Sequence, residues 1–349
     1  MKKLTLLITL SILLPILSGC GTEPAGGVVR VYNWGEYIDQ SIFRDFQREY
    51  GIRVDYKEFQ SNEEMYAQIR LGGTSFDVII PSDYMIARMI EEDMLAPLNF
   101  DNIPNFSLID PKYKNLEFDP GNIYSVAYMT GTVGLIYNSG MITHEVTSWG
   151  SLFDANYTGQ ILMFDNPRDA FGIALKYLGY SINTINENEI IEAYELLVLQ
   201  KPILQAYVMD QIFDKLESGE AAMGPYYAGD YLIMRSNNPE LRFARPVEGT
   251  NFFVDAMVVL KDAENKENAE KFINFMTSTE IALRNMEYIW YASANFEAAE
   301  IFAIEQELDA HDYSVIFAGA EVLANSDVFI HLPQHILDLY DRLWIQLRS

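Results

Sequence analysis

The sequence predicts an α/β protein built from two interleaved domains. Short apolar segments alternate with amphipathic helical segments near the start of the chain, a pattern typical of βαβ units and a largely parallel sheet. One extended run, from Tyr124 to Asn138, is long enough for a single strand to leave one domain and enter another. Roughly 330 residues remain after the leader described next, enough for two domains of ordinary size.

The first residues have the pattern of an export signal. Met1-Lys2-Lys3 precedes an apolar run from Leu4 to Leu17 that is too short to span a membrane. The run ends Leu17-Ser18-Gly19-Cys20, which resembles the lipobox of bacterial lipoproteins and implies cleavage before Cys20 and lipid attachment to it. We therefore expect a signal peptide at 1–19, a lipidated Cys20 with a flexible tether over 20–27, and a location on the periplasmic or extracytoplasmic side of a bacterial membrane.

Composition excludes some classes of partner. The net charge is −26, and loss of Lys2 and Lys3 with the leader makes it −28. Nucleic acid is therefore not an expected partner, because phosphate binding needs a basic face. The field of such a protein attracts small cations. Cys20 is the only cysteine, so no disulfide forms within the chain.

Two strand-to-helix turns in the first part of the chain carry aromatic and polar residues. A strand from Val28 ends at Asn33, and Trp34, Glu36 and Tyr37 follow in a turn before a helix that we expect from about 39 to 50, capped by Gly51. Further expected elements are a strand over 52–56, a helix from the capping box Ser61/Glu64 to 71, a strand over 77–80 and a helix to about 90.

The turn at 82–84 follows the last of these strands. It falls at the same edge of the sheet as the Trp34–Tyr37 turn, where ligands bind in open α/β sheets. Both turns are therefore expected to form one wall of a cation site.

The second part repeats this alternation. We place a hinge near Thr130 in the long strand. The expected helices lie at 147–153, after 169, and at 190–199, 211–218, 265–276 and 332–347, and the expected strands at 160–164, 206–209, 221–224 and 252–260. Asp255 interrupts an otherwise apolar strand, where an unpaired charge is costly. It is the most informative residue of this part.

Four segments together resemble a known family. In chain order they are Tyr32-Asn33-Trp34-Gly35-Glu36-Tyr37, Asp77-Val78-Ile79-Ile80-Pro81-Ser82-Asp83-Tyr84, Arg168-Asp169 and Phe253-Val254-Asp255. They resemble the spermidine/putrescine-binding proteins of bacterial polyamine ABC transporters, and the likeness runs from about Val28 to the C-terminus. It is weak after Ile301.

The resemblance implies a two-lobed periplasmic-binding-protein fold of type II, with mostly parallel sheets, helices on both faces and the ligand in the cleft between the lobes. The expected lobes are residues 28–130 with 256–300, and 131–255 with 301–349. The implied partners are a polyamine, the membrane permease of an ABC importer and, through Cys20, the membrane. No cofactor, metal or catalytic residue is implied, and the protein is not expected to be an enzyme.

The resemblance also assigns site residues. The expected ligand contacts are Trp34, Tyr37, Ser82, Tyr84, Asp169, Tyr227, Phe253, Asp255 and Tyr291; further candidates are Glu36, Thr130, Asn166 and Tyr226. Tyr227 and Phe253 stand where relatives often carry tryptophan, and Asn166 where relatives can carry aspartate. The sequence leaves two roles for Glu36: a ligand contact, or a charge at a helix N-terminus.

The chemistry of these residue types suits the same ligand class. Polyamines combine methylenes, which pack on flat aromatic walls, with ammonium groups, which need carboxylates and ring faces. Asp169 and Asp255 are the expected amine anchors, the aromatic residues the walls, and Ser82 and Thr130 hydrogen-bond partners.

Other functions are also considered. The adjacent Tyr226-Tyr227 pair suits a ferric-iron-binding protein of the same fold, although none of His144, His311, His331 and His335 is expected on the cleft wall. A sugar-binding lipoprotein would use the aromatics but not a buried Asp255. A glycosidase would need a carboxylate pair and would show turnover. A surface adhesin would bind a macromolecule. The sequence does not decide between putrescine and spermidine.

Overall fold

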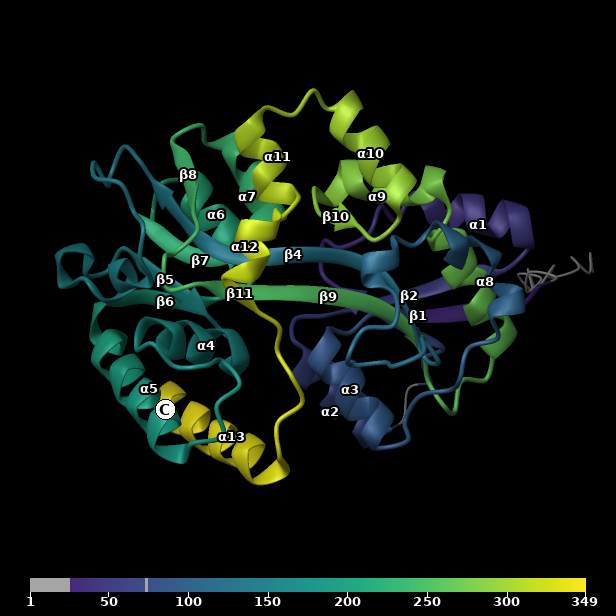
Figure 1. The fold of residues 1–349 in the computed structure, drawn as a ribbon, viewed down its shortest axis with the longest axis horizontal. Coiled ribbons are helices and arrows are strands. Elements are labelled where there is room, and N and C mark those ends of the chain that lie inside the picture. The colour runs from purple at the N-terminus through teal and green to yellow at the C-terminus, as the bar shows by residue number, and fades with distance from the viewer. Residues whose placement is uncertain (1–25, 73–74) are drawn as a thin grey trace, which may run out of the picture.

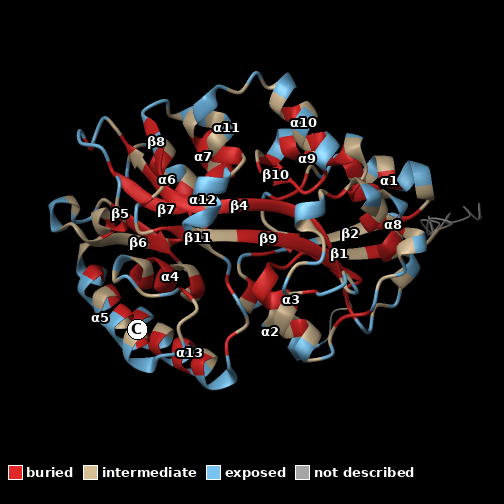
Figure 2. Ribbon diagram, in the orientation of Figure 1, coloured by how far each residue is buried: buried red, intermediate tan, exposed pale blue. Residues whose placement is uncertain are grey.

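Two long strands run through the middle of the molecule and join its two halves (Figure 1). In the computed structural model, which describes residues 26–72 and 75–349, β4 (Ser125–Asn138) pairs antiparallel with β9 (Thr250–Val259). A bulge interrupts this ladder between Ala127 and Met129. Both strands are buried along almost their whole length, and Figure 2 shows them as the continuous centre of the core. The predicted strand through 124–138 is confirmed.

The half on the right of Figure 1, called the first lobe, continues the sheet from β9. β3 pairs antiparallel with β9, and β1 pairs in parallel with both β3 and β2. Its elements are β1 (Val28–Trp34), α1 (Ile42–Tyr50), β2 (Arg53–Phe59), α2 (Asn62–Leu71), β3 (Val78–Ile79), α3 (Asp83–Glu91), α8 (Lys266–Met276), α9 (Thr279–Ile289), β10 (Ala292–Ser293) and α10 (Phe296–Glu305).

The other half, called the second lobe, is built around the far end of β4. β7 and β8 pair antiparallel with β4, and β5 pairs in parallel with β6 and β7. Its elements are β5 (Ile161–Phe164), α4 (Pro167–Tyr177), α5 (Glu187–Gln200), β6 (Leu204–Val208), α6 (Ile212–Glu217), β7 (Met223–Tyr227), α7 (Ala228–Asn237), β8 (Leu241–Ala244), α11 (Ala310–Ile316) and α13 (Gln334–Arg348).

A third chain segment lies across the junction of the lobes. α12 (Ala320–Ala324) leads into β11 (Ser326–Asp327), which pairs with the start of β9, and the chain then descends past the gap between α4 and α3 to α13 (Figure 1). The short 3₁₀ helices are Phe100–Asn102, Pro104–Leu108, Pro111–Tyr113, Trp149–Phe153, Ala155–Tyr157 and Lys201–Ile203. The chain passes between the lobes along β4, along β9 and again between α10 and α11. The predicted residue boundaries of the lobes stay a prediction.

Local sequence signals set the ends of the first helices. The Ser61 hydroxyl accepts the Glu64 amide N–H, as in a capping box, and the Glu64 carboxylate accepts the N–H of Gln60. Gly51 closes α1 in the left-handed conformation at φ 67°, where glycine avoids the strain of a side chain. Both predicted caps are confirmed.

Some element predictions need correction. The helix expected at 147–153 is a 3₁₀ helix, Trp149–Phe153, with the Ser148 hydroxyl capping Gly150. The strand expected at 221–224 instead spans Met223–Tyr227, because β4 supplies ladder partners as far as Tyr227. The expected parallel pairing holds for β1 with β2 and β3 and for β5 with β6 and β7. The two long strands instead pair antiparallel with each other, β3 pairs antiparallel with β9, and β7 and β8 pair antiparallel with β4.

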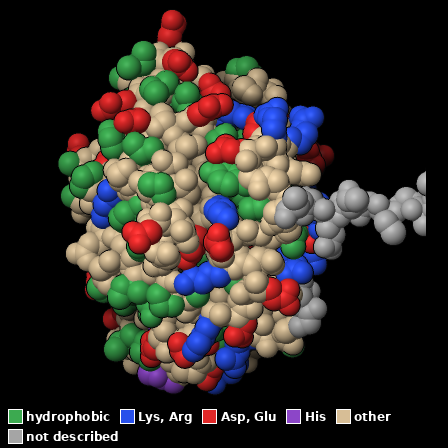
Figure 3. Space-filling view, turned by 90° about the vertical axis from the view of Figure 1, so that its right-hand side faces the viewer, with side chains coloured by type: hydrophobic (Ala, Val, Ile, Leu, Met, Phe, Trp, Pro, Cys, Tyr) green, Lys and Arg blue, Asp and Glu red, His purple; other side chains and the backbone are tan. Residues whose placement is uncertain are grey.

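Acidic and basic side chains are mixed on the end of the first lobe. Figure 3 shows them interspersed over this face, with apolar side chains between them. Several form ion pairs, such as Arg30 with Glu264 and Arg284 with Asp39. The negative net charge is therefore not gathered into one patch on this side of the molecule.

Within the described ranges, none of the helices is both long and apolar enough to cross a membrane. The predicted signal peptide and Cys20 lie outside the described residues.

Candidate functional site

A cleft lies between the lobes at the carboxyl ends of the strands. Its empty space, including the part open to solvent, is about 860 Å³. Twelve of the thirteen predicted site residues line it: Trp34, Glu36, Tyr37, Ser82, Tyr84, Asn166, Asp169, Tyr226, Tyr227, Phe253, Asp255 and Tyr291. Residues from four separate strand ends thus meet at one place, as the sequence predicts.

Thr130 is the exception: it is not among the residues that line the cleft, and its role as a ligand contact stays a prediction. Its hydroxyl donates to the Ala292 carbonyl at 3.5 Å and lies 3.3 Å from the Tyr113 hydroxyl, away from the cleft. Side chains alternate along a strand, so the next residue, Gly131, faces the cleft side. A Cβ there would lie 2.6 Å from Cζ of Phe253, so glycine at this position makes room for the Phe253 ring.

Asp255 lines the cleft and is buried, with 4% of its surface exposed. Its two oxygens each accept one hydroxyl, from Tyr37 and from Ser82, both at 2.7 Å. Burial raises the pKa of Asp255 to about 6, and these two hydrogen bonds oppose the rise. Each oxygen keeps a further lone pair that can accept an ammonium N–H.

Asp169 is fixed by the first turn of α4. The Asn166 side chain caps this helix by accepting the Asp169 N–H, and its amide group donates to the Asp169 carboxylate, both at 2.9 Å. The Tyr227 hydroxyl donates to the same carboxylate oxygen at 3.1 Å. Burial raises the pKa of Asp169, and these hydrogen bonds oppose the rise. Asn166 therefore orients Asp169 as well as lining the cleft.

Five tyrosines of the cleft share one arrangement: each donates its hydroxyl to a cleft carboxylate. The pairs are Tyr37 with Asp255 at 2.7 Å, Tyr84 with Glu63 at 2.9 Å, Tyr226 with Asp210 at 3.0 Å, Tyr227 with Asp169 at 3.1 Å, and Tyr291 with Asp230 at 2.5 Å. Burial and the facing carboxylates raise the pKa of these tyrosines well above the usual value, so they stay protonated donors. The bonds hold each ring as a wall and each carboxylate in a fixed orientation.

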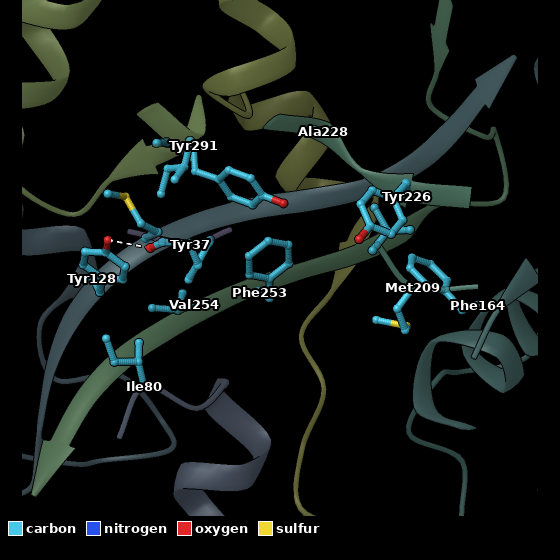
Figure 4. Packing of buried hydrophobic residues seen from close by; sticks show 14 of the residues in the cluster. Tyr37, Ile80, Tyr128, Phe164, Met209, Tyr226, Ala228, Phe253, Val254 and Tyr291 are labelled. Atoms are coloured by element: carbon cyan, nitrogen blue, oxygen red, sulfur yellow. Dashed lines mark hydrogen bonds between the residues drawn. The ribbon is translucent and has the colours of Figure 1, made fainter. Parts of the chain in front are cut away.

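The remaining aromatic walls are held by packing and by one hydrogen bond. Trp34 donates its indole N–H to the Ile80 carbonyl at 2.8 Å and packs on Phe59. The ring centroid of Phe253 lies 6.1 Å from that of Tyr291 and 5.5 Å from that of Tyr227. Figure 4 shows Phe253 below Tyr291. Figure 4 also shows the hydrogen bond that holds the Tyr37 backbone, in which the Tyr128 hydroxyl donates to the Tyr37 carbonyl.

Glu36 faces the cleft rather than a helix end. It adopts a left-handed backbone conformation, φ 50°, and accepts the Tyr288 hydroxyl at 3.2 Å. Because α1 begins only at Ile42, Glu36 is too far from that helix N-terminus to act as its first-turn charge. Of the two alternatives left open by the sequence, the structure favours the cleft.

Sequence reasoning missed four carboxylates of the cleft: Glu63, Asp83, Asp210 and Asp230. Asp83 accepts the backbone N–H groups of Tyr84 and Val254, and burial raises its pKa to about 8. Burial likewise raises the pKa of Asp230 to about 8, with nearby Asp210 and Glu36 adding to the rise. A usable signal existed for Asp83 and Asp230, since each begins or closely follows the start of a helix directly after a strand end.

The cleft lining as described contains seven carboxylates and a single basic side chain, Arg168. This balance favours a ligand that carries several positive charges. Within residues 26–72 and 75–349, no group of three His, Cys, Asp or Glu side chains is arranged to hold a metal ion. The adjacent tyrosines considered for iron donate to two different carboxylates, Asp210 and Asp169.

The fold and cleft are those of an extracytoplasmic solute-binding protein, and the comparisons agree. Residues 41–310 match the model of the bacterial extracellular solute-binding protein family, so the chain belongs to that family. A spermidine/putrescine-binding periplasmic protein of Escherichia coli K12 is 32% identical over 85% of this chain and 84% of its own length.

Two solved structures share the fold over nearly the whole described chain. A Listeria monocytogenes protein assigned to a spermidine/putrescine ABC transporter is 37% identical, covers 92% of this chain and 99% of its own, and has a TM-score of 0.88. The spermidine/putrescine ABC transporter substrate-binding protein of Streptococcus pneumoniae is 34% identical, with coverages of 92% and 98% and a TM-score of 0.76.

Proposed function

We propose that the protein captures a polyamine, putrescine or spermidine, in this cleft and delivers it to an ABC importer. The observation that carries the proposal is the set of tyrosine–carboxylate pairs, which offers apolar walls and fixed anionic acceptors side by side. A polyamine has matching chemistry, with methylenes between ammonium groups. The names of the relatives, which concern spermidine and putrescine, support the same ligand class.

Roles can be assigned to the predicted residues. Asp255 and Asp169 anchor ammonium groups. Ser82 orients the carboxylate of Asp255, and Asn166 orients that of Asp169. Trp34, Tyr37, Tyr84, Tyr227, Phe253 and Tyr291 pack on the methylenes and face the ammonium groups with their rings, with Glu36 and Tyr226 at the edge. A cation over such a ring contributes about 0.5–1 kcal/mol when exposed and about 2 kcal/mol when desolvated. The lobes, divided at about residues 130 and 255, close on the ligand.

A binding protein differs from an enzyme in having no turnover. The chain belongs to a family of solute-binding proteins, and the cleft carboxylates are all explained as acceptors of hydroxyl or amide donors. We therefore propose binding without catalysis and without a cofactor.

The leader and Cys20 give the proposed location. We infer that Cys20 is lipidated and that the tether holds the protein on the outer side of a bacterial membrane, next to the permease of the importer. The Cys20→Ser variant is then expected to leave the membrane fraction, as measured by cell fractionation. Retention of C20S in the membrane fraction would contradict the lipid anchor, but not the ligand.

A thermal-shift panel tests the function. Putrescine or spermidine at about 100 times its dissociation constant should stabilise the fold by about 2.7 kcal/mol. Sugars, Fe(III) and neutral diols of similar length serve as controls. A response to a sugar or to Fe(III) without any response to polyamines would overturn the proposal in favour of one of the alternative ligands.

A further inference from the structure

Arg168 is the one basic residue of the described cleft lining, and it is buried. It lies in the first turn of α4, directly before the anchor Asp169, and only 3% of its surface is exposed. A buried cation in a site built for cations is unexpected, because like charges repel. Its position therefore needs a physical account.

Three aromatic rings surround the guanidinium. Its central carbon lies 4.4 Å from the ring centre of Phe329, 5.0 Å from that of Tyr84 and 5.8 Å from that of Tyr340. These rings come from α3 of the first lobe, from α13 of the second and from the segment between β11 and α13. Arg168 is thus held at one end of the cleft by packing and cation–π contacts.

Its polar groups are only partly satisfied. Nη2 donates to the Asn183 side chain and to the Ile330 carbonyl, both at a long 3.4 Å. Nε and Nη1 have no hydrogen-bond partner within the part of the chain that the structure describes. A fixed, incompletely paired positive charge is therefore buried in the lining of the cleft.

Arg168 lies next to one group of cleft carboxylates. The Tyr84 ring that its guanidinium contacts carries the hydroxyl that donates to Glu63, and Asp169 is the next residue along α4. Burial raises the pKa of Glu63, Asp83 and Asp169, and the positive charge of Arg168 offsets part of that rise. One positive charge of the protein is therefore already placed among these carboxylates.

We propose that Arg168 limits the positive charge that the cleft accepts by standing in for a ligand ammonium beside Glu63 and Asp169. The proposal rests on the proposed polyamine function and adds a specificity-determining residue to it. A ligand with one more ammonium must place that group near the guanidinium, where it is repelled. We do not assign Arg168 as a recognition site for an anion, because the seven carboxylates of the described cleft lining would repel an anionic group.

The test compares a diamine with a triamine and a tetramine. Calorimetric titrations of putrescine, spermidine and spermine are made with the wild type and with Arg168→Met, which keeps apolar bulk against the three rings. Removal of the charge is expected to raise the affinity for spermidine relative to putrescine by at least tenfold, and that for spermine by more. This expectation concerns the change on substitution, whichever polyamine the wild type prefers.

Two controls separate charge from packing and from general electrostatics. Arg168→Lys keeps the positive charge at the same place. Arg88→Met removes one positive charge from α3 outside the cleft, where Arg88 packs on Tyr66 and pairs with Glu92. Both variants are expected to keep the ratio of spermidine to putrescine affinity within about threefold of the wild type.

An unchanged ratio in Arg168→Met, with polyamines still bound, would overturn the inference and leave Arg168 as a packing residue. If Arg168→Met does not fold, the ratio of spermidine to putrescine affinity is measured with Arg168→Gln instead. The wild type is also titrated with 4-aminobutyrate. This compound has the length of putrescine with a carboxylate at one end. We expect no binding, and saturable binding would identify Arg168 as an anion anchor instead. Failure of the wild type to bind any polyamine would reject the proposed function itself, which keeps the two failures distinguishable.

Discussion

Replacing Asp255 by asparagine tests the charge at the centre of the cleft. Burial raises the pKa of Asp255 from 3.8 to about 6, so at pH 7.5 its ionisation destabilises the folded apo protein by about 3 kcal/mol relative to the unfolded chain. The introduced amide keeps the size of the carboxylate and can still pair with the Tyr37 and Ser82 hydroxyls, since a hydroxyl can accept as well as donate. The free energy of unfolding of apo D255N is therefore expected to equal that of the wild type or to exceed it by up to about 3 kcal/mol.

Polyamine affinity is expected to fall in the same variant. Truncating one partner of a buried, hydrogen-bonded charge pair lowers binding free energy by about 2–5 kcal/mol, or roughly 30-fold to several thousand-fold in dissociation constant. Denaturant unfolding measures the free energy of unfolding of apo D255N. Calorimetric titration with putrescine and spermidine measures its dissociation constants. A stable variant that binds polyamine within threefold of the wild type would refute the role of Asp255. A loss of more than about 2 kcal/mol of apo stability would show that Asp255 is structural.

Three further predictions concern pH and the cleft walls. Because the folded pKa values of Asp83, Asp230 and Asp255 lie above their unfolded values, the stability they contribute is present near pH 4 and is lost as pH rises through about 6 to 8. Ammonium groups relieve this loss, so the thermal shift caused by putrescine should grow from pH 5 to pH 8.5, and a shift that is constant over this range would contradict it. Tyr37→Phe removes a hydrogen bond to the Asp255 carboxylate and should weaken putrescine binding by about fivefold at pH 6.5 and less at pH 8.5; equal loss at both pH values, by calorimetry, would argue against it. Gly131→Ala places a Cβ against Phe253 and should reduce stability by about 1–3 kcal/mol together with affinity; a variant as stable as the wild type by chemical denaturation would show that the ring can move away.

Local signals in the sequence predicted much of the fold. Ser61 and Gly51 end helices through bonds to near neighbours, and the long apolar run at 124–138 can only be a strand in a protein of this class. The antiparallel pairing of β4 with β9 joins segments more than 110 residues apart, so no local pattern encodes it. The extension of β7 to Tyr227 has the same cause, because its ladder partner lies on β4.

The candidate site was predicted where residues follow strand ends. Asp255 and the Trp34–Tyr37 turn were found because a charge in an apolar strand and aromatics in a turn are both unusual. Glu63 was missed since it looked like a solvated first-turn acid of α2, and only the fold brings it to the Tyr84 hydroxyl. Thr130 lies outside the described cleft lining because the face of a strand depends on register, and one residue decides whether a side chain meets the cleft.

Titration calorimetry of the mature protein with putrescine, spermidine and butane-1,4-diol tests the central claim most directly. The diol has the carbon chain of putrescine without its charges, so it separates the aromatic walls from the anionic acceptors. The account predicts saturable one-to-one binding of at least one polyamine and no measurable binding of the diol. Equal binding of the diol, or no binding of either polyamine, would contradict it.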